Sequence, residues 1–286
     1  MFSKKIRTIL GVATLALAVA LTGCGGNDKK ADAPKAGAVE GKVTAQGSTA
    51  LLPLLKAAQE QFEAKNPKVT INLTGGGSFT GMNQVANKAV DIGNSDVELT
   101  AELKDKGLVD NKVVVLPFVL IVNPDVSVSN LTQEQAIDVL SGKITNWKEL
   151  GGKDQKITII GRAASSGSRA TIATKILKGG SFAKDAVVLD SNGAVKTGVA
   201  TTAGAIGYVD APYADKTVKV LDYNGVKYSP EAIIGGKYQI WSYGHMYTNG
   251  KPAGATKAFI DFVTSKDFQE ANASKLGFIP VTSMPK

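Results

Sequence analysis

The stretch LTGGGSFTGMNQVANKAVDIGNSD, residues 73–96, carries the features that determine the fold and the site of this chain. Its glycine triplet allows a tight turn, and Ser78 is placed to cap a following helix whose first N–H groups point into that turn. Such a helix end attracts anions. The strand-like run 90–93 then delivers Asp96 to a second turn. If that strand returns beside the glycine loop, the carboxylate accepts a hydrogen bond from an anion that carries a proton, and this combination suggests phosphate.

A purely structural interpretation of the same stretch competes with this one. Ser78 can be a helix cap and nothing more, and Asp96 can cap a helix that begins near Thr100. The rest of the chain has to decide between the two interpretations.

The N-terminus is typical of an exported protein. Lys4, Lys5 and Arg7 precede an apolar run at 9–21, which ends in Leu-Thr-Gly-Cys at 21–24. This order predicts a secretory signal, because the run is shorter than the ~20 residues of a membrane-spanning helix. Removing residues 1–23 takes away three positive charges and lowers the formal net charge from +8 to +5. A mildly basic mature chain argues against a dedicated nucleic-acid binder.

Several catalytic classes are excluded by what the chain lacks. Cys24 is the only cysteine and His245 the only histidine, so the chain has no internal disulfide and no zinc site of the Cys/His type. A Ser-His-Asp triad would require His245, and a lone histidine is more often a packed or surface residue. Gly-x-Ser-x-Gly and Gly-Lys-[Ser/Thr] are both missing. We therefore expect no metal, no cofactor and no enzymatic activity.

The mature chain opens as an α/β domain. Residues 25–41 are rich in Gly, Ala, Lys and Asp and predict a disordered tether. A short strand at 42–45 leads through Gly-Ser-Thr-Ala at 47–50 into apolar residues at helical spacing over 51–62, and 69–73 alternates like a strand. Strand, Ser/Thr turn, helix and strand in this order predict α/β architecture.

A third strand, Ser/Gly turn and helix start adds a cation. The strand at 157–160 opens into a turn at 161–168, and a helix is predicted over 169–177. Arg162 can bind two phosphate oxygens at once, while Ser166, Ser168 and the Gly167 amide donate beside it. Three such turns, one with an arginine and one with a carboxylate, favour an anion site over the structural interpretation.

The remaining pattern indicates a second domain. The apolar run 113–122 predicts one or two buried strands broken at Pro117, with the first crossing to a second domain at about 118–123 and the return within 222–248. The other predicted elements are helices over 131–140, 194–201 and 252–264, and strands over 187–189 and 205–209.

Over its whole mature length the chain resembles the phosphate-binding lipoproteins of bacterial ABC importers, within the periplasmic-binding-protein superfamily. The motifs that carry the resemblance are Gly47-Ser-Thr-Ala50, Gly75-Gly-Gly-Ser78, Asp91-Ile-Gly-Asn-Ser-Asp96, Ile144-Thr-Asn-Trp-Lys-Glu-Leu-Gly-Gly152, Arg162 with Ser166-Gly-Ser168, Gly204-Ala-Ile-Gly-Tyr-Val209 and Gly277-Phe-Ile-Pro-Val281. The ending Leu21-Thr-Gly-Cys24 is similar to a lipobox, which makes Cys24 the lipidated first residue of the mature chain.

The resemblance implies two α/β lobes joined by a hinge, with phosphate dehydrated in the cleft between them. The implied organisation is a lipoprotein signal peptide at 1–23, a tether at 24–41, lobe I at 42–120 and 223–286, and lobe II at 121–222. The phosphate ligands implied are, in lobe I, Ser48, the Thr49 hydroxyl, the Ala50 amide, Ser78 and Asp96 and, in lobe II, Arg162, Ser166, the Gly167 amide and Ser168. Asp96 would accept the proton of hydrogen phosphate, which sulfate does not have at neutral pH.

Two departures from the family pattern stand out. Many relatives have an acidic residue two positions after the arginine, where it restrains the guanidinium, and here that position is Ala164. The segment 238–248, YQIWSYGHMYT, also differs from the commoner version that contains Pro and Arg.

The expected function is capture of inorganic phosphate by a monomeric receptor that is lipid-anchored outside the cytoplasm and delivers the ion to an ABC permease. Three alternatives stay open. The first is a receptor for another tetrahedral oxyanion, such as sulfate or molybdate. The second is an exported phosphotransfer enzyme or phosphatase, and the third an adhesion or signalling protein that keeps the fold without the ligand.

Overall fold

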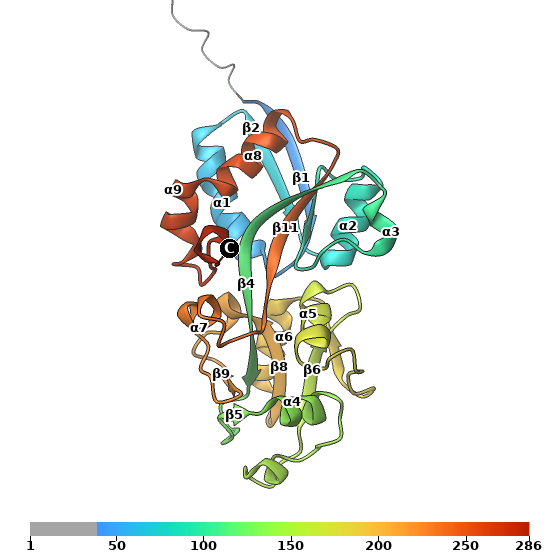
Figure 1. The fold of residues 1–286 in the computed structure, drawn as a ribbon, viewed down its shortest axis with the longest axis vertical. Coiled ribbons are helices and arrows are strands. Elements are labelled where there is room, and N and C mark those ends of the chain that lie inside the picture. The colour runs from blue at the N-terminus through green and yellow to red at the C-terminus, as the bar shows by residue number, and fades with distance from the viewer. Residues whose placement is uncertain (1–38, 286) are drawn as a thin grey trace, which may run out of the picture. The chain divides into compact units, whose positions relative to one another are not determined.

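The computed structural model describes residues 39–285, and within them the chain forms two α/β lobes that share one nine-stranded sheet (Figure 1). The strands pair in the order β2-β1-β3-β11-β4-β8-β6-β7, and β9 adds to β4. The predicted signal peptide, Cys24 and the tether up to residue 38 lie outside the described residues. No helix between residues 39 and 285 has the length and apolarity needed to cross a membrane.

The first lobe begins with the predicted alternation of strands and helices. Parallel strands β1 (Gly41–Gly47), β2 (Val69–Thr74) and β3 (Ile92–Ser95) are connected by helices α1 (Leu52–Lys65) and α2 (Ser78–Ala86). Helix α1 buries Leu54, Leu55, Ala58 and Phe62, which are among the apolar positions whose spacing predicts it. The short helix α3 (Ala101–Lys104) follows.

One long strand connects the two lobes. Strand β4 (Leu108–Val122) pairs antiparallel with β11 (Trp241–Asn249) as far as Pro117, and from Phe118 onward it pairs with β8 (Ala205–Asp210). The predicted break at Pro117 is therefore wrong. Proline lacks an N–H group, but it lies where the strand exchanges one partner for the other, so its missing donor does not interrupt a ladder.

The second lobe extends the sheet from β8 through β6 (Thr158–Arg162) to the edge strand β7 (Val187–Leu189). Its helices are α4 (Gln133–Leu140), α5 (Gly167–Lys175) and α6 (Asn192–Thr201). The elements that complete the chain are β5 (Asn130–Leu131), η1 (Trp147–Leu150), η2 (Ala211–Tyr213), β9 (Lys219–Val220), β10 (Asp222–Tyr223), α7 (Pro230–Ile234), α8 (Gly254–Thr264), α9 (Lys266–Phe268), η3 (Gln269–Ala273) and η4 (Val281–Ser283).

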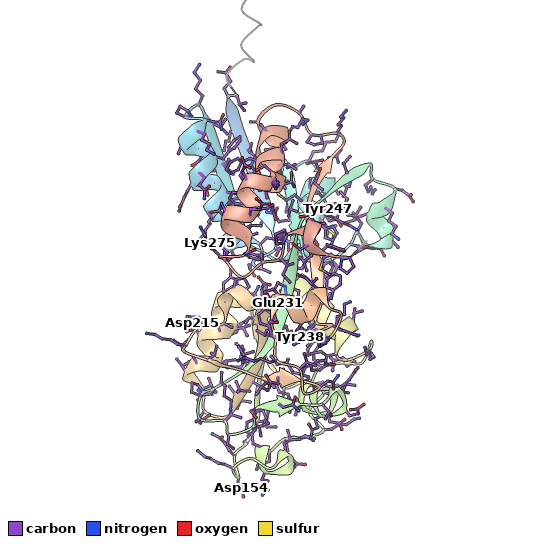
Figure 2. The ribbon with its side chains drawn as sticks, turned by 60° about the vertical axis from the view of Figure 1, so that its left-hand side comes forward. Asp154, Asp215, Glu231, Tyr238, Tyr247 and Lys275 are labelled. Atoms are coloured by element: carbon purple, nitrogen blue, oxygen red, sulfur yellow. The ribbon has the colours of Figure 1, made fainter. Side chains whose placement is uncertain are left out.

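Two contacts of the segment 222–238, where the chain is predicted to return to the first lobe, bear on the boundary between the lobes. Strand β10 pairs with β5, and the Tyr238 hydroxyl donates to the Phe118 carbonyl at 2.9 Å. Figure 2 shows Tyr238 and Glu231 with the side chains of the lower lobe, and Tyr247 with those of the upper one. The division of the chain into 42–120 with 223–286 and 121–222 stays a prediction.

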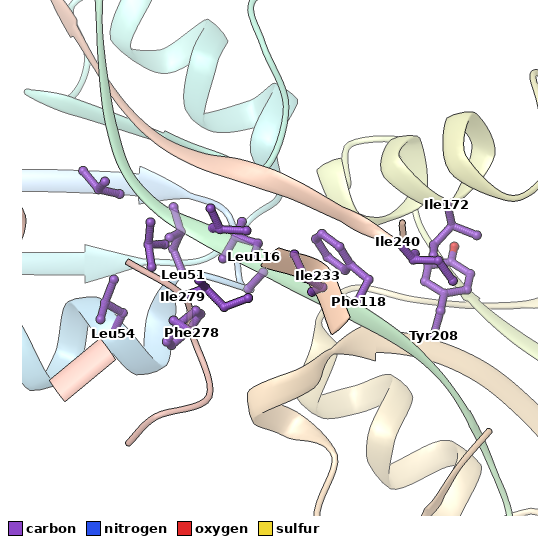
Figure 3. Close-up of a cluster of buried hydrophobic side chains, with 14 of the residues drawn as sticks. Leu51, Leu54, Leu116, Phe118, Ile172, Tyr208, Ile233, Ile240, Phe278 and Ile279 are labelled. Carbon is purple, nitrogen blue, oxygen red and sulfur yellow. The ribbon is translucent and has the colours of Figure 1, made fainter. Parts of the chain in front are cut away.

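The hydrophobic core is continuous along β4 (Figure 3). On one side of the strand Leu116 packs with Leu51, the N-cap residue of α1, with Leu54 of α1 and with Phe278 and Ile279. Ile279 also forms a bridge to Val115. Phe118 continues the same buried cluster toward Ile172, Tyr208, Ile233 and Ile240 (Figure 3). Each of these side chains is at most 1% exposed, so β4 holds both lobes in one packed interior.

One buried and one exposed valine in the second half of the sheet give a matched test of this packing. Val119 of β4 is fully buried, whereas Val188 of the edge strand β7 is 56% exposed. We expect Val119→Ala to lower the free energy of unfolding by about 2 kcal/mol, because two methyl groups leave a packed interior. Val188→Ala should change it by less than about 0.5 kcal/mol. Urea denaturation of both variants measures the difference, and equal losses would contradict the placement of β4 in the core.

Candidate functional site

Four helices begin at the junction of the two lobes, each at the carboxyl end of a parallel strand. Helices α1 and α2 follow β1 and β2, and helices α5 and α6 follow β6 and β7. Such helix ends present unpaired N–H groups and a partial positive charge. The two lobes approach closely here, because a Cβ atom added to Gly167 would lie 2.8 Å from Ser78 Cβ and 2.9 Å from Asp96 Cβ. Only glycine fits at that contact.

Asp96 lies at the centre of this junction and is 1% exposed. Its carboxylate accepts hydrogen bonds from the hydroxyl of Ser48 and, at 3.0 Å, from the hydroxyl of Ser168. Its main-chain N–H donates to Ser78 Oγ at 2.9 Å. The carboxylate therefore connects an element of the first lobe to the first turn of α5 in the second.

The interpretation of Ser78 and Asp96 as helix caps is wrong. Helix α2 has Gly77 as its N-cap residue and α3 has Thr100, and neither helix receives a side-chain cap bond. Ser78 does not cap its own helix because its hydroxyl accepts from the Asp96 amide instead. Asp96 is held by two hydroxyls and does not reach the start of α3.

Arg162, the last residue of β6, is buried beside this carboxylate at 1% exposure. Its Nη2 donates to the Asp190 carbonyl at 3.0 Å, and its Nη1 lies 3.5 Å from Ser168 Oγ. Its Nε has no hydrogen-bond partner within residues 39–285. Ala164 is exposed, and the guanidinium is restrained here by a main-chain carbonyl.

The other predicted residues converge on the same place. Ser48, Thr49, Ala50, Ser166 and Gly167 are all buried there. Ser166 caps α5 by accepting from the Arg169 N–H at 3.2 Å, which leaves its own proton free to donate. The structure thus brings all nine predicted residues to the lobe junction, and their role as ligands stays a prediction.

Three further residues at the junction escaped the sequence analysis. Asn192 is the first residue of α6 and contacts Thr49 and Ser168, and the Tyr213 hydroxyl donates to the Thr49 carbonyl at 2.5 Å. Asp210, the last residue of β8, is fully buried, and neither of its carboxylate oxygens has a partner in the described part of the chain. The Ser-Asn-Gly sequence after the strand at 187–189 is a fourth start of the same kind and was the one available indication.

The electrostatics of the junction are dominated by burial. Burial raises the pKa of Asp96, although hydrogen bonds from Ser48 and Ser168 and the charge of Arg162 oppose the shift. Burial and the neighbouring Asp96 raise the pKa of Asp210 well above its ordinary value. Burial also lowers the pKa of the Arg162 guanidinium, against the effect of Asp96. One cation and two acidic side chains thus share a dehydrated region, which favours the protonated form of Asp210.

A cavity of about 500 Å³ adjoins Asp96, and residues of the unusual 238–248 segment line it. Trp241, Tyr243 and His245 of β11 line one wall, and Thr171 of α5 lines another. His245 is the packed residue that its isolation in the sequence favours, because it is 1% exposed and its Nδ1 lies 2.8 Å from Asp110 Oδ1. Among residues 39–285 no cluster of three His, Cys, Asp or Glu side chains could hold a metal ion.

The buried Asp210 predicts a characteristic dependence of stability on pH. Its folded-state pKa is raised, so above the ordinary value of about 3.9 the unfolded chain releases a proton that the folded chain retains. The free energy of unfolding therefore falls as the pH rises through that window. We expect Asp210→Asn to exceed the wild type in free energy of unfolding near pH 7, and this gain should shrink toward pH 4. Urea denaturation across this range measures it.

Asp215 provides a control of opposite sign. Hydrogen bonds, first from the Thr217 hydroxyl, lower the pKa of this exposed carboxyl to about 2. Its contribution to stability is therefore present above the ordinary pKa and is lost as the pH falls. Asp215→Asn should be less stable than the wild type at pH 7, and a gain from this variant or a pH-independent effect of Asp210→Asn would contradict the assignment.

Comparison with known proteins gives a consistent result across the chain. A family model described as "PBP superfamily domain" matches residues 32–267. The phosphate-binding protein PstS of Bacillus subtilis (strain 168) is 41% identical over an alignment that covers 99% of this chain and 96% of the relative. PstS of Borreliella burgdorferi is 30% identical, with 84% of this chain and 90% of the relative covered.

Solved structures show the same architecture. A phosphate ABC transporter substrate-binding protein from Clostridium perfringens, crystallised with bound phosphate, superposes with a TM-score of 0.80 at 30% identity, over 84% of this chain and all of the other. An ABC-type phosphate transport receptor from Vibrio cholerae superposes with a TM-score of 0.69 at 28% identity, over 85% of this chain and all of that one.

Proposed function

This chain belongs to the PBP superfamily, in the family of the PstS phosphate-binding proteins, and from that premise we propose that it captures inorganic phosphate between its two lobes and delivers the ion to an ABC importer. The observation that carries the proposal is the buried cluster of Asp96, Ser48, Ser168 and Arg162. It combines a guanidinium, several hydroxyls and four helix N-termini as donors with the Asp96 carboxylate as acceptor.

The donors suit a tetrahedral oxyanion. Arg162 Nε has no hydrogen-bond partner among the described residues, and the Ala50 and Gly167 amides lie just ahead of α1 and at the first position of α5. Peptide N–H groups and a guanidinium bind phosphate oxygens without water, because each donor is fixed in direction before the anion arrives. Ser48, Thr49, Ser78, Ser166 and Ser168 add hydroxyls that can rotate toward it.

The acceptor sets the choice of anion. A carboxylate at Asp96 receives the proton of hydrogen phosphate, whereas sulfate and molybdate offer no proton at neutral pH and would meet an unpaired negative charge. Sulfate and molybdate receptors are therefore disfavoured. The relatives named above are described as binding proteins or receptors, and this supports a chain that is not an enzyme.

Titration of the purified protein, freed of bound anion by unfolding and refolding, tests the proposal directly. We expect one phosphate to bind per chain in isothermal calorimetry, with sulfate and molybdate at least about 10²-fold weaker. Preferential binding of sulfate or molybdate would replace phosphate with another oxyanion. If none of the three binds, the adhesion or signalling alternative gains support, and turnover of a chromogenic phosphate ester would favour the enzyme alternative.

Asp96→Asn separates the carboxylate from the donors in the same assay. The amide keeps the size of the side chain and removes the charge, so the preference for phosphate over sulfate should fall by about tenfold or more. Asp105→Asn, at an exposed position after α3, is the matched control and should leave the ratio unchanged. An unchanged ratio in Asp96→Asn would remove Asp96 from anion selection.

The location of the protein is part of the same proposal. We infer a monomer that is held at the outer face of a membrane by a lipid on Cys24, with the segment up to residue 41 as its tether, and that meets permease subunits there. The Leu-Thr-Gly-Cys sequence at 21–24 supports this.

Cell fractionation tests the anchor. Wild-type protein should sediment with membranes, and Cys24→Ser should move at least about half of it to the soluble fraction or the medium, because a single acyl-bearing residue provides the attachment. Ser3→Ala, at a position ahead of the apolar run, is the control and should stay with the membranes. Retention of Cys24→Ser in the membrane would contradict the anchor.

A further inference from the structure

A buried amide that the proposed ligand set does not include lies between the two lobes. Asn192 is fully buried at the first position of α6. It does not cap its helix, since Ser191 is the N-cap residue and accepts from the Ala194 N–H at 3.1 Å. The Asn192 side chain is therefore free to bond elsewhere, and all of its partners are outside α6.

The orientation of the amide is fixed by one neighbour. The main-chain N–H of Asp210 donates to Asn192 Oδ1 at 3.1 Å. A peptide N–H can only donate, so the amide atom that faces it must be the oxygen. Nδ2 then points to the opposite side, where it donates to Thr49 Oγ1 at 3.2 Å and lies 3.5 Å from Ser168 Oγ.

These contacts determine what the Thr49 hydroxyl can do. Thr49 Oγ1 accepts from Nδ2 and also from the Asn192 main-chain N–H at 3.3 Å, so both of its lone pairs are engaged. Its single proton has no acceptor within residues 39–285, although the side chain is only 5% exposed. The hydroxyl is left as a pure donor in the dehydrated junction.

The Ser168 hydroxyl also faces donors, one of which is the Asn192 amide. Its hydroxyl receives Asn192 Nδ2 and Arg162 Nη1, both at 3.5 Å, and donates its own proton to Asp96. Asn192 thus supplies protons to a hydroxyl of each lobe and takes none from either. An acceptor-rich anion is the ligand that the free proton of Thr49 complements.

We propose that Asn192 is a positioning residue of the phosphate site, which fixes the Thr49 hydroxyl as a donor toward the anion, directs the proton of Ser168 toward Asp96 and connects the first lobe to α6 of the second. This assignment rests on the proposed function. It concerns a residue that acts through Thr49 and Ser168, and Asp210 contributes by setting the direction of the amide.

The experiment uses the full chain, purified in detergent and titrated with inorganic phosphate. Asn192→Ala should weaken binding by about tenfold, the effect of one or two lost hydrogen bonds to a buried group. Asn192→Asp has nearly the same shape but presents acceptors and a negative charge, so it should weaken binding more at pH 8. Relative to the wild type at each pH, its deficit should shrink toward pH 5, because a protonated carboxyl regains one donor.

A double-mutant cycle separates positioning from a general loss of structure. Thr49→Val removes the hydroxyl, so Asn192→Ala should cost clearly less affinity in that background than in the wild type. Asn83→Asp, at an exposed position of α2, is the charge-matched control and should bind phosphate normally. If Asn192→Ala does not fold, Asn192→Asp with its pH profile carries the test.

The outcomes separate the two proposals. Failure of the wild type to bind phosphate overturns the proposed function and this assignment with it. Normal binding by the wild type and by both Asn192 variants overturns the assignment alone. Weakened binding that is additive with Thr49→Val and independent of pH in Asn192→Asp also overturns it, because it shows a structural role without coupling to the hydroxyl.

Discussion

The Asp96 carboxylate, bonded to Ser48 on one side and to Ser168 on the other, is the constraint on which the rest of the junction depends. Burying a carboxylate is costly unless donors replace its water. Here the donors come from different lobes, so the carboxylate is satisfied only when the lobes meet. The same requirement explains Gly167, because any side chain at that position would separate Ser78 and Asp96 from the first turn of α5.

Strand β4 restricts the orientations in which the two lobes can approach each other. It contributes to the ladder with β11 and then to the ladder with β8, and its residues 113–122 are buried throughout. Two lobes on separate linkers could meet in many orientations, whereas a strand shared by both half-sheets restricts them to a bend or twist of one ribbon. Pro117 lies where the partner changes, at a position that needs the fewest ladder bonds.

The sequence predicted the elements that depend on local pattern and missed those that depend on partners distant along the chain. Apolar spacing identified α1, and Ser/Gly turns after strands identified three of the four helix starts at the junction. The sequence pattern could not show that the Ser78 hydroxyl accepts from the Asp96 amide and does not cap α2, because this hydrogen bond depends on where β3 places Asp96. The strand at 187–189 and the helix after it were predicted, but Asn192 was missed because the residues that it contacts, Thr49 and Ser168, are distant from it along the chain.

The partner of Arg162 illustrates the same limit at the level of charge. With Ala164 in place of an acidic residue, side-chain chemistry alone suggests a loosely held guanidinium and a more positive cleft. The structure supplies the restraint from the Asp190 carbonyl and places a second acidic side chain, Asp210, near Asp96. A carbonyl restrains the guanidinium without neutralising it, so the full positive charge remains available to an anion. Because burial favours the protonated form of Asp210, that acid adds little opposing charge. Arg162 is therefore fixed in place without an acidic side chain at position 164, and Asp96 is the negative charge that remains beside it.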